Sequence, residues 1–212
     1  MQRIGVLGSA GVGKTLAEGF KKHGYAVRIG SRSPGKLAEF SKQSGIEAGT
    51  FEDVAAWGEI LVLAVKGTAA EPLVAQLGTR LDGKVVIDTT NPIAEAPPTD
   101  GVLSFFTGPN ESLLERLQKS RPAARFVKSW SSVGAARMVD PAFGDGTPTM
   151  FLCGNDDVAR KSVAAILDQF GWEPADMGTA VAARAIEPLA MLWCIPGFRE
   201  NVWNHAFKVL RK

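Results

Sequence analysis

Short apolar runs bounded by glycine alternate with longer amphipathic stretches through most of the chain. This alternation is typical of βαβ units built around a parallel sheet. The apolar runs predict strands over residues 3–8, 26–31, 60–65, 85–88, 125–129 and 149–153. Apolar positions that recur at three and four residues predict helices over residues 12–23, 35–44, 69–77, 112–119 and 157–170. We therefore expect an α/β fold with a Rossmann-type, doubly wound parallel sheet.

The pattern changes in the C-terminal third of the chain. From Thr179 onward Ala, Leu, Met and Trp dominate, which predicts two helices broken at Pro196-Gly197, the second resuming over residues 200–210. These helices are too apolar to stand in water, so we expect them to pack on the sheet or on a second subunit. We predict a Rossmann domain over residues 1–140. A small, mainly helical C-terminal domain over residues 141–212 would cap the second-substrate site and form a homodimer.

Composition and charge narrow the class of partner. The 212 residues leave room for one large domain, or for one domain and a small partner. The net charge is +2 with both signs interspersed, which argues against a nucleic-acid surface and favours small molecules. We see neither a signal peptide nor an apolar run approaching a membrane span, so we expect a cytoplasmic protein. Cys153 and Cys194 lie outside metal-ligand spacing, which favours buried, reduced thiols.

A glycine-rich loop, Gly8-Ser9-Ala10-Gly11-Val12-Gly13-Lys14-Thr15, joins the first predicted strand to the first helix and matches two fingerprints. In a dinucleotide-binding loop, Gly8 makes the tight turn, Ala10 stands where the pyrophosphate comes close, and Gly13 lets the helix pack on the sheet. In a P-loop, Lys14 would reach the terminal phosphates and Thr15 would bind magnesium, with Asp88 on a second metal-binding strand. The loop alone leaves both interpretations open.

The end of the second predicted strand favours the dinucleotide. Ser31, Arg32 and Lys36 lie about twenty residues beyond the loop, where this fold reaches the adenosine ribose. An acidic residue would bind the ribose hydroxyls of NAD, whereas a hydroxyl and two cations suit the 2′-phosphate of NADP. Basic residues in a first helical turn oppose the helix dipole, so a bound anion explains them better than a solvated helix start. We therefore predict NADP binding and interpret Lys14 as a surface lysine.

Three later loops should line the nicotinamide side, because ligands of open α/β sheets bind at the carboxyl ends of the strands. The predicted cofactor-binding residues of these loops are Ala64, Val65 and Lys66, then Asn91 and Pro92, then Ser132. Asn91-Pro92 would also fit a plain turn. Trp130, in the third loop, would either face a planar cofactor or fill the core.

No side chain is predicted to act as a catalytic acid or base, and no metal site is predicted. His23 and His205 are the two histidines, and neither lies near the strand ends. His23 closes the first predicted helix, which favours a structural role, and His205 falls in the last one. Hydride transfer between two cofactors needs no protein acid or base and fits this absence.

Taken in order, the motifs resemble the coenzyme F420-dependent NADP reductase family, whose Rossmann domain is shared with the cytosolic domain of ferric reductases of the six-transmembrane prostate antigen type. The likeness covers nearly the whole chain. It is carried by Ile4-Gly5-Val6-Leu7-Gly8-Ser9, Gly30-Ser31-Arg32 with Lys36, Ile87-Asp88-Thr89-Thr90-Asn91-Pro92, Asp140-Pro141-Ala142-Phe143-Gly144 and residues 150–156, 170–174 and 185–193. The resemblance implies that NADP binds Gly8, Ser9, Ala10, Gly11, Val12 and Gly13 together with Ser31, Arg32 and Lys36. It further implies that the later loops place the nicotinamide beside coenzyme F420.

Two departures from the family pattern matter, the first for the pyrophosphate turn and the second for the hydride partner. Ala10 replaces the usual second glycine, and Ser129-Trp130-Ser131-Ser132 stands where the family tends to carry Ala-Phe-Asn-Thr. The second departure lies at the predicted active edge. A flavin or another small acceptor therefore stays open as the hydride partner, as does a non-catalytic NADP sensor. A P-loop nucleoside triphosphatase is the interpretation that the second strand disfavours.

Overall fold

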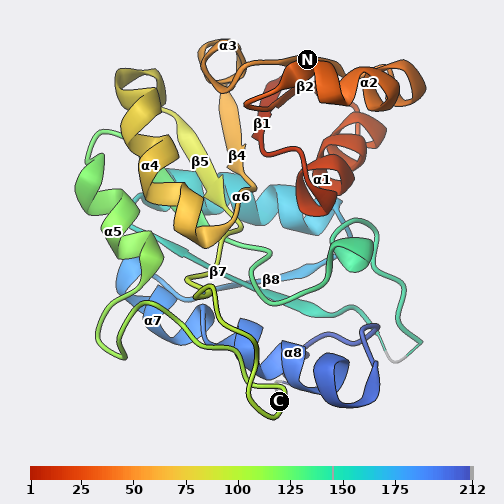
Figure 1. Cartoon of the computed structure of the whole chain (residues 1–212), viewed down its shortest axis with the longest axis vertical. Helices are drawn as coiled ribbons and strands as arrows, with labels where there is room; N and C mark the ends of the chain where they lie inside the picture. Colours follow the sequence, from red (N-terminus) through yellow and green to blue (C-terminus); the bar gives the residue numbers. More distant parts are fainter. Residues whose placement is uncertain (145, 211–212) are drawn as a thin grey trace.

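One sheet of eight strands runs through the computed structural model, which describes residues 1–144 and 146–210 (Figure 1). The strands are β1 (Arg3–Leu7), β2 (Ala26–Gly30), β3 (Glu47–Gly49), β4 (Ile60–Leu63), β5 (Val85–Asp88), β6 (Arg125–Lys128), β7 (Thr149–Gly154) and β8 (Glu173–Asp176). Their order is β3-β2-β1-β4-β5-β6-β7-β8. The first six are parallel, β7 is antiparallel to β6, and β8 is parallel to β7. The predicted α/β class and doubly wound sheet are confirmed.

Helices cover both faces of this sheet (Figure 1). They are α1 (Gly11–Lys22), α2 (Ala38–Ser44), α3 (Phe51–Trp57), α4 (Gly67–Leu77), α5 (Leu113–Ser120), α6 (Asp157–Gln169), α7 (Ala183–Ile186) and α8 (Leu189–Glu200). Short 3-10 turns occupy Pro34–Leu37, Gly78–Leu81, Ala135–Arg137 and Ala180–Ala182. One apolar core forms beneath α1 and α6, and a second beneath α3, α4, α5 and α7. A helical C-terminal region is therefore present, as predicted.

Side-chain alternation along the strands explains why there are two cores. In β4, Ile60 and Val62 point into the first core, whereas Leu61 and Leu63 point into the second. All four side chains are buried, which fits a central strand covered on both faces. Burying each such side chain contributes about 1.5 to 3 kcal/mol, so a continuous apolar run is stable only where helices cover both sides.

Three short elements were not predicted, and each lacks a clear periodic signal. β3 has three residues and α3 has seven, too few for a pattern to stand out. β8 reads Glu-Pro-Ala-Asp, and this proline is tolerated because β8 is an edge strand. Pairing with β7 therefore decides the conformation of β8, which its own composition does not predict.

The prediction for the last forty residues was wrong in two respects. Helix α8 continues through Pro196 and Gly197, and it ends at Asn201, which adopts a left-handed conformation with φ of +57°. Residues 201–210 contain no helix. They fold back along the molecule, and the Phe207 carbonyl accepts a hydrogen bond of 2.8 Å from the Thr149 amide at the start of β7. Trp203 packs on α8 and Ala206 on the first core, whereas Val202 and Leu210 are exposed, so the apolar pattern of this segment does not form a helical face.

The tail also explains the glycine in α8. A Cβ atom on Gly197 would lie 2.3 Å from the Trp203 ring, so the ring packs directly on the helix backbone. Trp193 donates a hydrogen bond of 2.8 Å to the His205 carbonyl, and the two rings stack at 5.0 Å. His205 therefore lies in an irregular segment and not in a helix.

The sheet continues across residues 140 and 141, because β7 and β8 add two strands to it. The division into domains at that point stays a prediction.

The expectation that no apolar run approaches a membrane span was wrong. Ala180–Glu200 is 21 residues long with a mean hydropathy of 1.3, which is enough to cross a membrane by length and composition alone. Glu187 in its middle is buried in an ion pair with Lys128, and 33% of this stretch is buried.

Candidate cofactor site

Five parallel strands end at one edge of the sheet. Leu7 of β1 pairs in register with Gly30 of β2 and Leu63 of β4, Leu63 pairs with Asp88 of β5, and Asp88 pairs with Lys128 of β6. The loops that follow these strands therefore lie along the same line. All the residues predicted to bind a cofactor belong to these loops or to the helix starts behind them, so the sheet brings them to one edge.

The glycine loop has the close packing that a dinucleotide requires. Gly8 has φ of +150°, and a Cβ atom there would lie 2.0 Å from the Ala64 carbonyl oxygen. A Cβ atom on Gly13 would lie 2.0 Å from the Gly8 carbonyl oxygen, so α1 approaches β1 as closely as predicted. Around Gly11, in contrast, no described atom lies within 4 Å of the position of a Cβ atom. The loop is thus tight toward the sheet and open where a pyrophosphate would approach.

The start of α1 is available to an anion. Its N-cap residue is Ala10, and no side chain in the described chain caps its first amides. No acidic residue lies in the first turn, and Ser9 and Val12 are half-buried beside exposed Ala10 and Gly11. Uncapped amides and the helix dipole together bind phosphate groups, which supports the predicted role of residues 8–13.

The predicted 2′-phosphate residues lie beside this loop. The Ser9 hydroxyl donates a hydrogen bond of 3.3 Å to the Ser31 hydroxyl, which also accepts one of 3.1 Å from the Ser33 amide. Ser31 is buried, whereas Arg32 and Lys36 are exposed. Within residues 1–144 and 146–210, neither cation forms an ion pair with a carboxylate. They are therefore free to meet a phosphate.

The later loops form a continuous row across the edge. The Ala64 carbonyl contacts Gly8, as described above, and a Cβ atom on Gly67 would lie 1.9 Å from the Asn91 carbonyl oxygen. The Asn91 side-chain amide donates a hydrogen bond of 2.8 Å to the Ser131 carbonyl. The loops after β1, β4, β5 and β6 thus touch one another in sheet order. Of the other predicted residues, Val65 is half-buried, Lys66 is exposed, and Pro92 and Ser132 are buried in this row.

The third loop is strained and carries unpartnered polar atoms. Trp130 is fully buried with φ of +52°, a conformation that costs a bulky residue on the order of 1 to 3 kcal/mol. Its ring packs against Phe20 and Phe170, so it fills the core. Four buried atoms at this edge have no hydrogen-bond partner in the described chain: Asn91 Oδ1, Ser129 Oγ, Trp130 Nε1 and Ser131 Oγ. Such atoms favour a site completed by a polar ligand.

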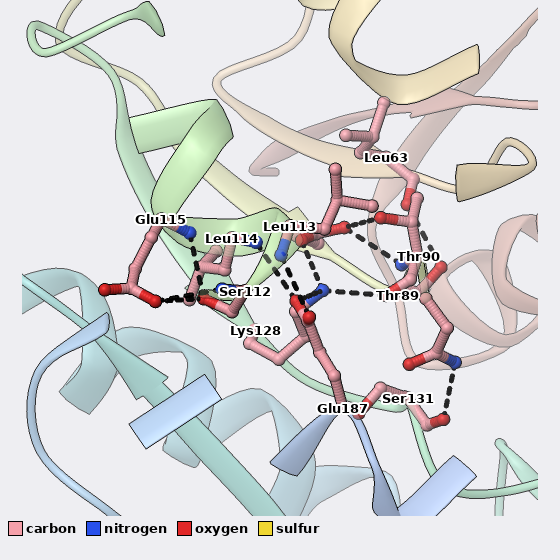
Figure 2. Close-up of polar contacts among 12 residues, drawn as sticks. Leu63, Thr89, Thr90, Ser112, Leu113, Leu114, Glu115, Lys128, Ser131 and Glu187 are labelled. Atoms are coloured by element: carbon pink, nitrogen blue, oxygen red, sulfur yellow. Dashed lines mark hydrogen bonds and ion pairs between the residues drawn. The ribbon is translucent and has the colours of Figure 1, made fainter. Parts of the chain in front are cut away.

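A buried ionic network lies directly beneath the row (Figure 2). Lys128 Nζ contacts Asp88 Oδ2 at 2.6 Å, Glu187 Oε1 at 2.9 Å and the Thr90 carbonyl at 2.7 Å. The Glu187 carboxylate also accepts hydrogen bonds from the first two amides of α5. Burial by itself lowers the pKa of Lys128, but the two carboxylates outweigh it and the pKa lies above its usual value. This raised pKa favours the charged form of Lys128.

This network also bears on the P-loop interpretation. Asp88, which a P-loop protein would turn toward magnesium, has no exposed surface and pairs with Lys128. Lys14 Nζ lies 5.4 Å from the centre of the Phe40 ring, between α1 and α2. These contacts favour the dinucleotide interpretation.

Neither histidine reaches the edge. His23 caps α1, contacts Asp140 Oδ1 at 2.9 Å and stacks on Phe170 at 4.5 Å. His205 Nε2 contacts the Trp193 carbonyl at 3.0 Å. Both rings are therefore held by contacts outside the predicted cofactor loops: His23 by Asp140 and Phe170, and His205 by Trp193. An open depression of about 720 Å³ at the opposite end of β6, lined by Glu115, Gln118, Arg125 and Asn155 among others, contains none of the predicted residues.

Sequence reasoning missed Lys128 and Glu187 altogether and considered Asp88 only as a metal ligand. A signal was present, because each is a single charge within an apolar run: Val-Val-Ile-Asp, Phe-Val-Lys, and Ala-Ile-Glu-Pro-Leu-Ala. Charged residues are rarely buried without a partner, so isolated charges in buried runs predict one another. The pattern does not say which charges pair.

Comparison with known proteins identifies relatives over both halves of the chain. A family model described as NADP oxidoreductase, coenzyme F420-dependent, matches residues 3–92. The F420-dependent NADP reductase of Methanocaldococcus jannaschii is 29% identical over 206 residues, covering 90% of each chain. Metalloreductase STEAP3 of Rattus norvegicus is 28% identical over 92% of this chain, but this chain spans only 38% of that protein's length.

A solved structure covers the whole molecule. The crystal structure of a candidate F420-dependent NADP reductase from Arthrobacter sp. FB24 superposes with a TM-score of 0.91, at 30% identity and with 100% of both chains covered. The match includes the C-terminal helices that the family model leaves out. The family's description implies NADP and coenzyme F420 as cofactors, and the glycine loop and the free cations described above fit the first of them. This chain belongs to the coenzyme F420-dependent NADP oxidoreductase family.

Proposed function

We propose that this protein transfers a hydride between NADP(H) and coenzyme F420. The observation that carries the proposal is the single row of loops along the sheet edge. It begins at the unpaired cations Arg32 and Lys36, passes the open glycine loop, and ends at the unpartnered polar atoms of Asn91 and Ser131. That row offers, in order, the groups suited to a 2′-phosphate, a pyrophosphate and a nicotinamide.

The residues have distinct roles in this proposal. Ser31, Arg32 and Lys36 bind the 2′-phosphate, and the amides of residues 8–13 bind the pyrophosphate. The segments 64–66, 91–92 and 129–132 line the nicotinamide side. NADP, when bound, supplies the nicotinamide carbon that gives or takes the hydride. The protein supplies position, because a buried edge with fixed loops holds the ring in one orientation.

The second substrate belongs beside the C-terminal helices. A Cβ atom on Gly134, in the loop after β6, would lie 2.7 Å from the Trp193 ring of α8, so helix and edge are in contact. On the other side of α8, Gly101 packs against Arg199 and the Ile195 carbonyl. The segments around Gly101 and Gly134 therefore both reach α8, where apolar residues favour a flat ring system.

No proton transfer by the protein is required. In the described chain, Asp88 and Glu187 are the buried carboxylates of this region, and both are paired with Lys128. Holding two reactants in contact is worth roughly 7 to 11 kcal/mol, which is sufficient for a step without an acid or base.

A flavin or another small acceptor is the second candidate. It is favoured by Ser129-Trp130-Ser131-Ser132, which departs from the family pattern at the edge that would meet the hydride partner. Two buried serine hydroxyls there lack hydrogen-bond partners in the described chain, so their hydrogen-bonding capacity is unused at the edge that would meet the ring. We also propose that the protein forms a homodimer, because Leu192, Phe198 and Trp203 are exposed. We propose a reducing compartment such as the cytoplasm, because both cysteines are free.

The test is stopped-flow mixing of purified protein with NADP and chemically reduced F420, with NADPH formation followed by absorbance. A parallel series uses reduced flavin, and the reverse reaction uses NADPH with each oxidised partner. Transfer with F420 and not with flavin supports the proposal, and the opposite result supports the second candidate. If no partner exchanges hydride while NADP still binds, the protein is a non-catalytic NADP sensor and the proposal is wrong.

A further inference from the structure

The Lys128 network joins three parts of the molecule that the proposed reaction must hold together. Asp88 ends β5, Lys128 ends β6, and Glu187 lies between α7 and α8. All three side chains are within 2% of complete burial. Lys128 uses its three N–H donors on three different acceptors, the two carboxylates and the Thr90 carbonyl, so it is fully satisfied.

Thr90 is held by this network on three of its polar atoms. Its carbonyl accepts from Lys128, while its amide and hydroxyl donate to Asp88 Oδ1 at 2.9 and 2.6 Å. The next residue, Asn91, is then tied to the Ser131 carbonyl. The segments 89–92 and 129–132 are thereby joined by two bonds, from Lys128 to Thr90 and from Asn91 to Ser131. These are the two segments that line the proposed nicotinamide position.

Glu187 connects this pair of segments to the C-terminal helices. Its carboxylate accepts hydrogen bonds of 2.9 and 3.0 Å from the amides of Leu113 and Leu114, which begin α5, in addition to its contact with Lys128 (Figure 2). Two carboxylates face one ammonium group, and the positive end of α5 offsets the remaining negative charge. The Glu187 carboxylate therefore links the start of α5 and the segment between α7 and α8 to Lys128 on the nicotinamide side.

Stability alone does not account for these charges. Removing charged groups from water costs several kcal/mol each, and apolar residues of similar size are often as stable or more stable in such positions. An ionic network does differ from an apolar core in directionality, because each bond fixes the position of its partner. The neighbouring strained Trp130 and the unpartnered atoms of Asn91 and Ser131 show that this part of the edge is not arranged for packing alone.

We propose that Lys128 and Glu187 are positioning residues for hydride transfer, which hold the segments 89–92 and 129–132 in register with the C-terminal helices without touching either substrate. This inference rests on the proposed function. It assigns a role to residues that lie beneath the site.

The test compares Glu187→Gln with Arg184→Gln. Arg184 lies three residues earlier, in α7, and forms an exposed ion pair with Glu115, so it controls for the loss of a neighbouring charge. In Glu187→Gln we expect the single-turnover hydride-transfer rate to fall about 10- to 100-fold, because a small misplacement of reactants has effects of that size. The NADP dissociation constant should stay within about threefold, since the binding groups are elsewhere. Arg184→Gln should change neither quantity.

A purely structural role would give a different result. With NADPH deuterated at the transferred position, misplacement should increase the isotope effect on turnover in Glu187→Gln, whereas partial unfolding lowers the active fraction and leaves the isotope effect unchanged. Lys128→Met combined with Asp88→Asn removes one charge of each sign. This double variant should also lower the hydride-transfer rate and increase the isotope effect. A Glu187→Gln rate within about twofold of the parent protein, or a rate loss matched by the loss of folded protein, would overturn the inference.

A second readout separates this inference from the proposed function. The emission of bound NADPH reports the surroundings of its nicotinamide ring and needs no acceptor. If the parent protein transfers hydride to no partner, the proposed function fails. A changed emission in Glu187→Gln and an unchanged one in Arg184→Gln would then still show that Glu187 positions the segments around the nicotinamide, though not for hydride transfer. Unchanged emission in both variants would count against it.

Discussion

Replacing Arg32 with alanine should weaken NADP binding and spare NAD binding. Arg32 is exposed and forms no ion pair in the described chain, so its removal breaks no internal contact and should leave the free energy of unfolding nearly unchanged. Ser31 beside it is buried and bonded to Ser9 and Ser33, so the hydroxyl that shares the phosphate stays in place. The perturbation is therefore confined to one charge.

The expected magnitude follows from this exposure. A hydrogen bond to a charged group contributes about 1.5 to 3 kcal/mol, and solvent screening at an exposed position favours the lower half of that range. A loss of about 1.5 to 2 kcal/mol corresponds to roughly a 10- to 30-fold higher NADP dissociation constant. Because NAD lacks the 2′-phosphate, its dissociation constant should change by less than about twofold.

Calorimetric titration of both nucleotides gives the comparison directly. Lys42→Ala is the matched control, since Lys42 is an exposed cation in the last turn of α2 and its loss changes the net charge equally. The NADP penalty in Arg32→Ala should shrink as the salt concentration rises. Equal losses for NADP and NAD, or an equal loss in Lys42→Ala, would refute the assignment of Arg32 to the phosphate.

Three further outcomes are expected. Lys14→Ala should raise the NADP dissociation constant by no more than about tenfold, because backbone amides bind a pyrophosphate and Lys14 lies against Phe40. Loss of magnesium-dependent ATP hydrolysis in this variant would contradict the interpretation of Lys14 as a surface lysine. Leu192 is 55% exposed on α8, so Leu192→Glu should convert the proposed homodimer to a monomer, as measured by light scattering. A parent protein that is already monomeric would exclude the dimer. A hydrogen bond from Lys22 holds the pKa of Asp140 below its usual value in the folded protein. The ionised Asp140 carboxylate therefore stabilises the fold above the unfolded-state pKa of about 3.9, and this stabilisation is lost as the pH falls through the folded-state pKa. Asp140→Asn, which tolerates the left-handed backbone there, should therefore flatten the acid side of a urea-unfolding profile measured against pH, and an unchanged profile would contradict it.

Local patterns were sufficient for the parts of the site that depend on neighbours in the chain. The glycine loop, Ser31 and the cations after it were placed by their spacing, because a βαβ unit is built from consecutive residues. The loops after β4, β5 and β6 were placed by the rule that parallel strands end at one edge, and the strand register confirms this arrangement. These predictions needed only the order of the elements.

Contacts between distant residues decided the rest. Glu187 meets Lys128 and the start of α5 from more than fifty residues away, and the tail beyond Asn201 lies on β7 instead of forming a helix. β8 is a strand only because β7 lies beside it.

The sequence by itself therefore determined the class of fold, and it predicted a cofactor loop followed by cations suited to a phosphate, since each depends on short-range periodicity or spacing. Only the tertiary structure decided which buried charges pair and how the C-terminal helices are joined to the edge. The physical reason is that an isolated charge in an apolar run must find a partner, while the identity of that partner depends on which segments the sheet brings together.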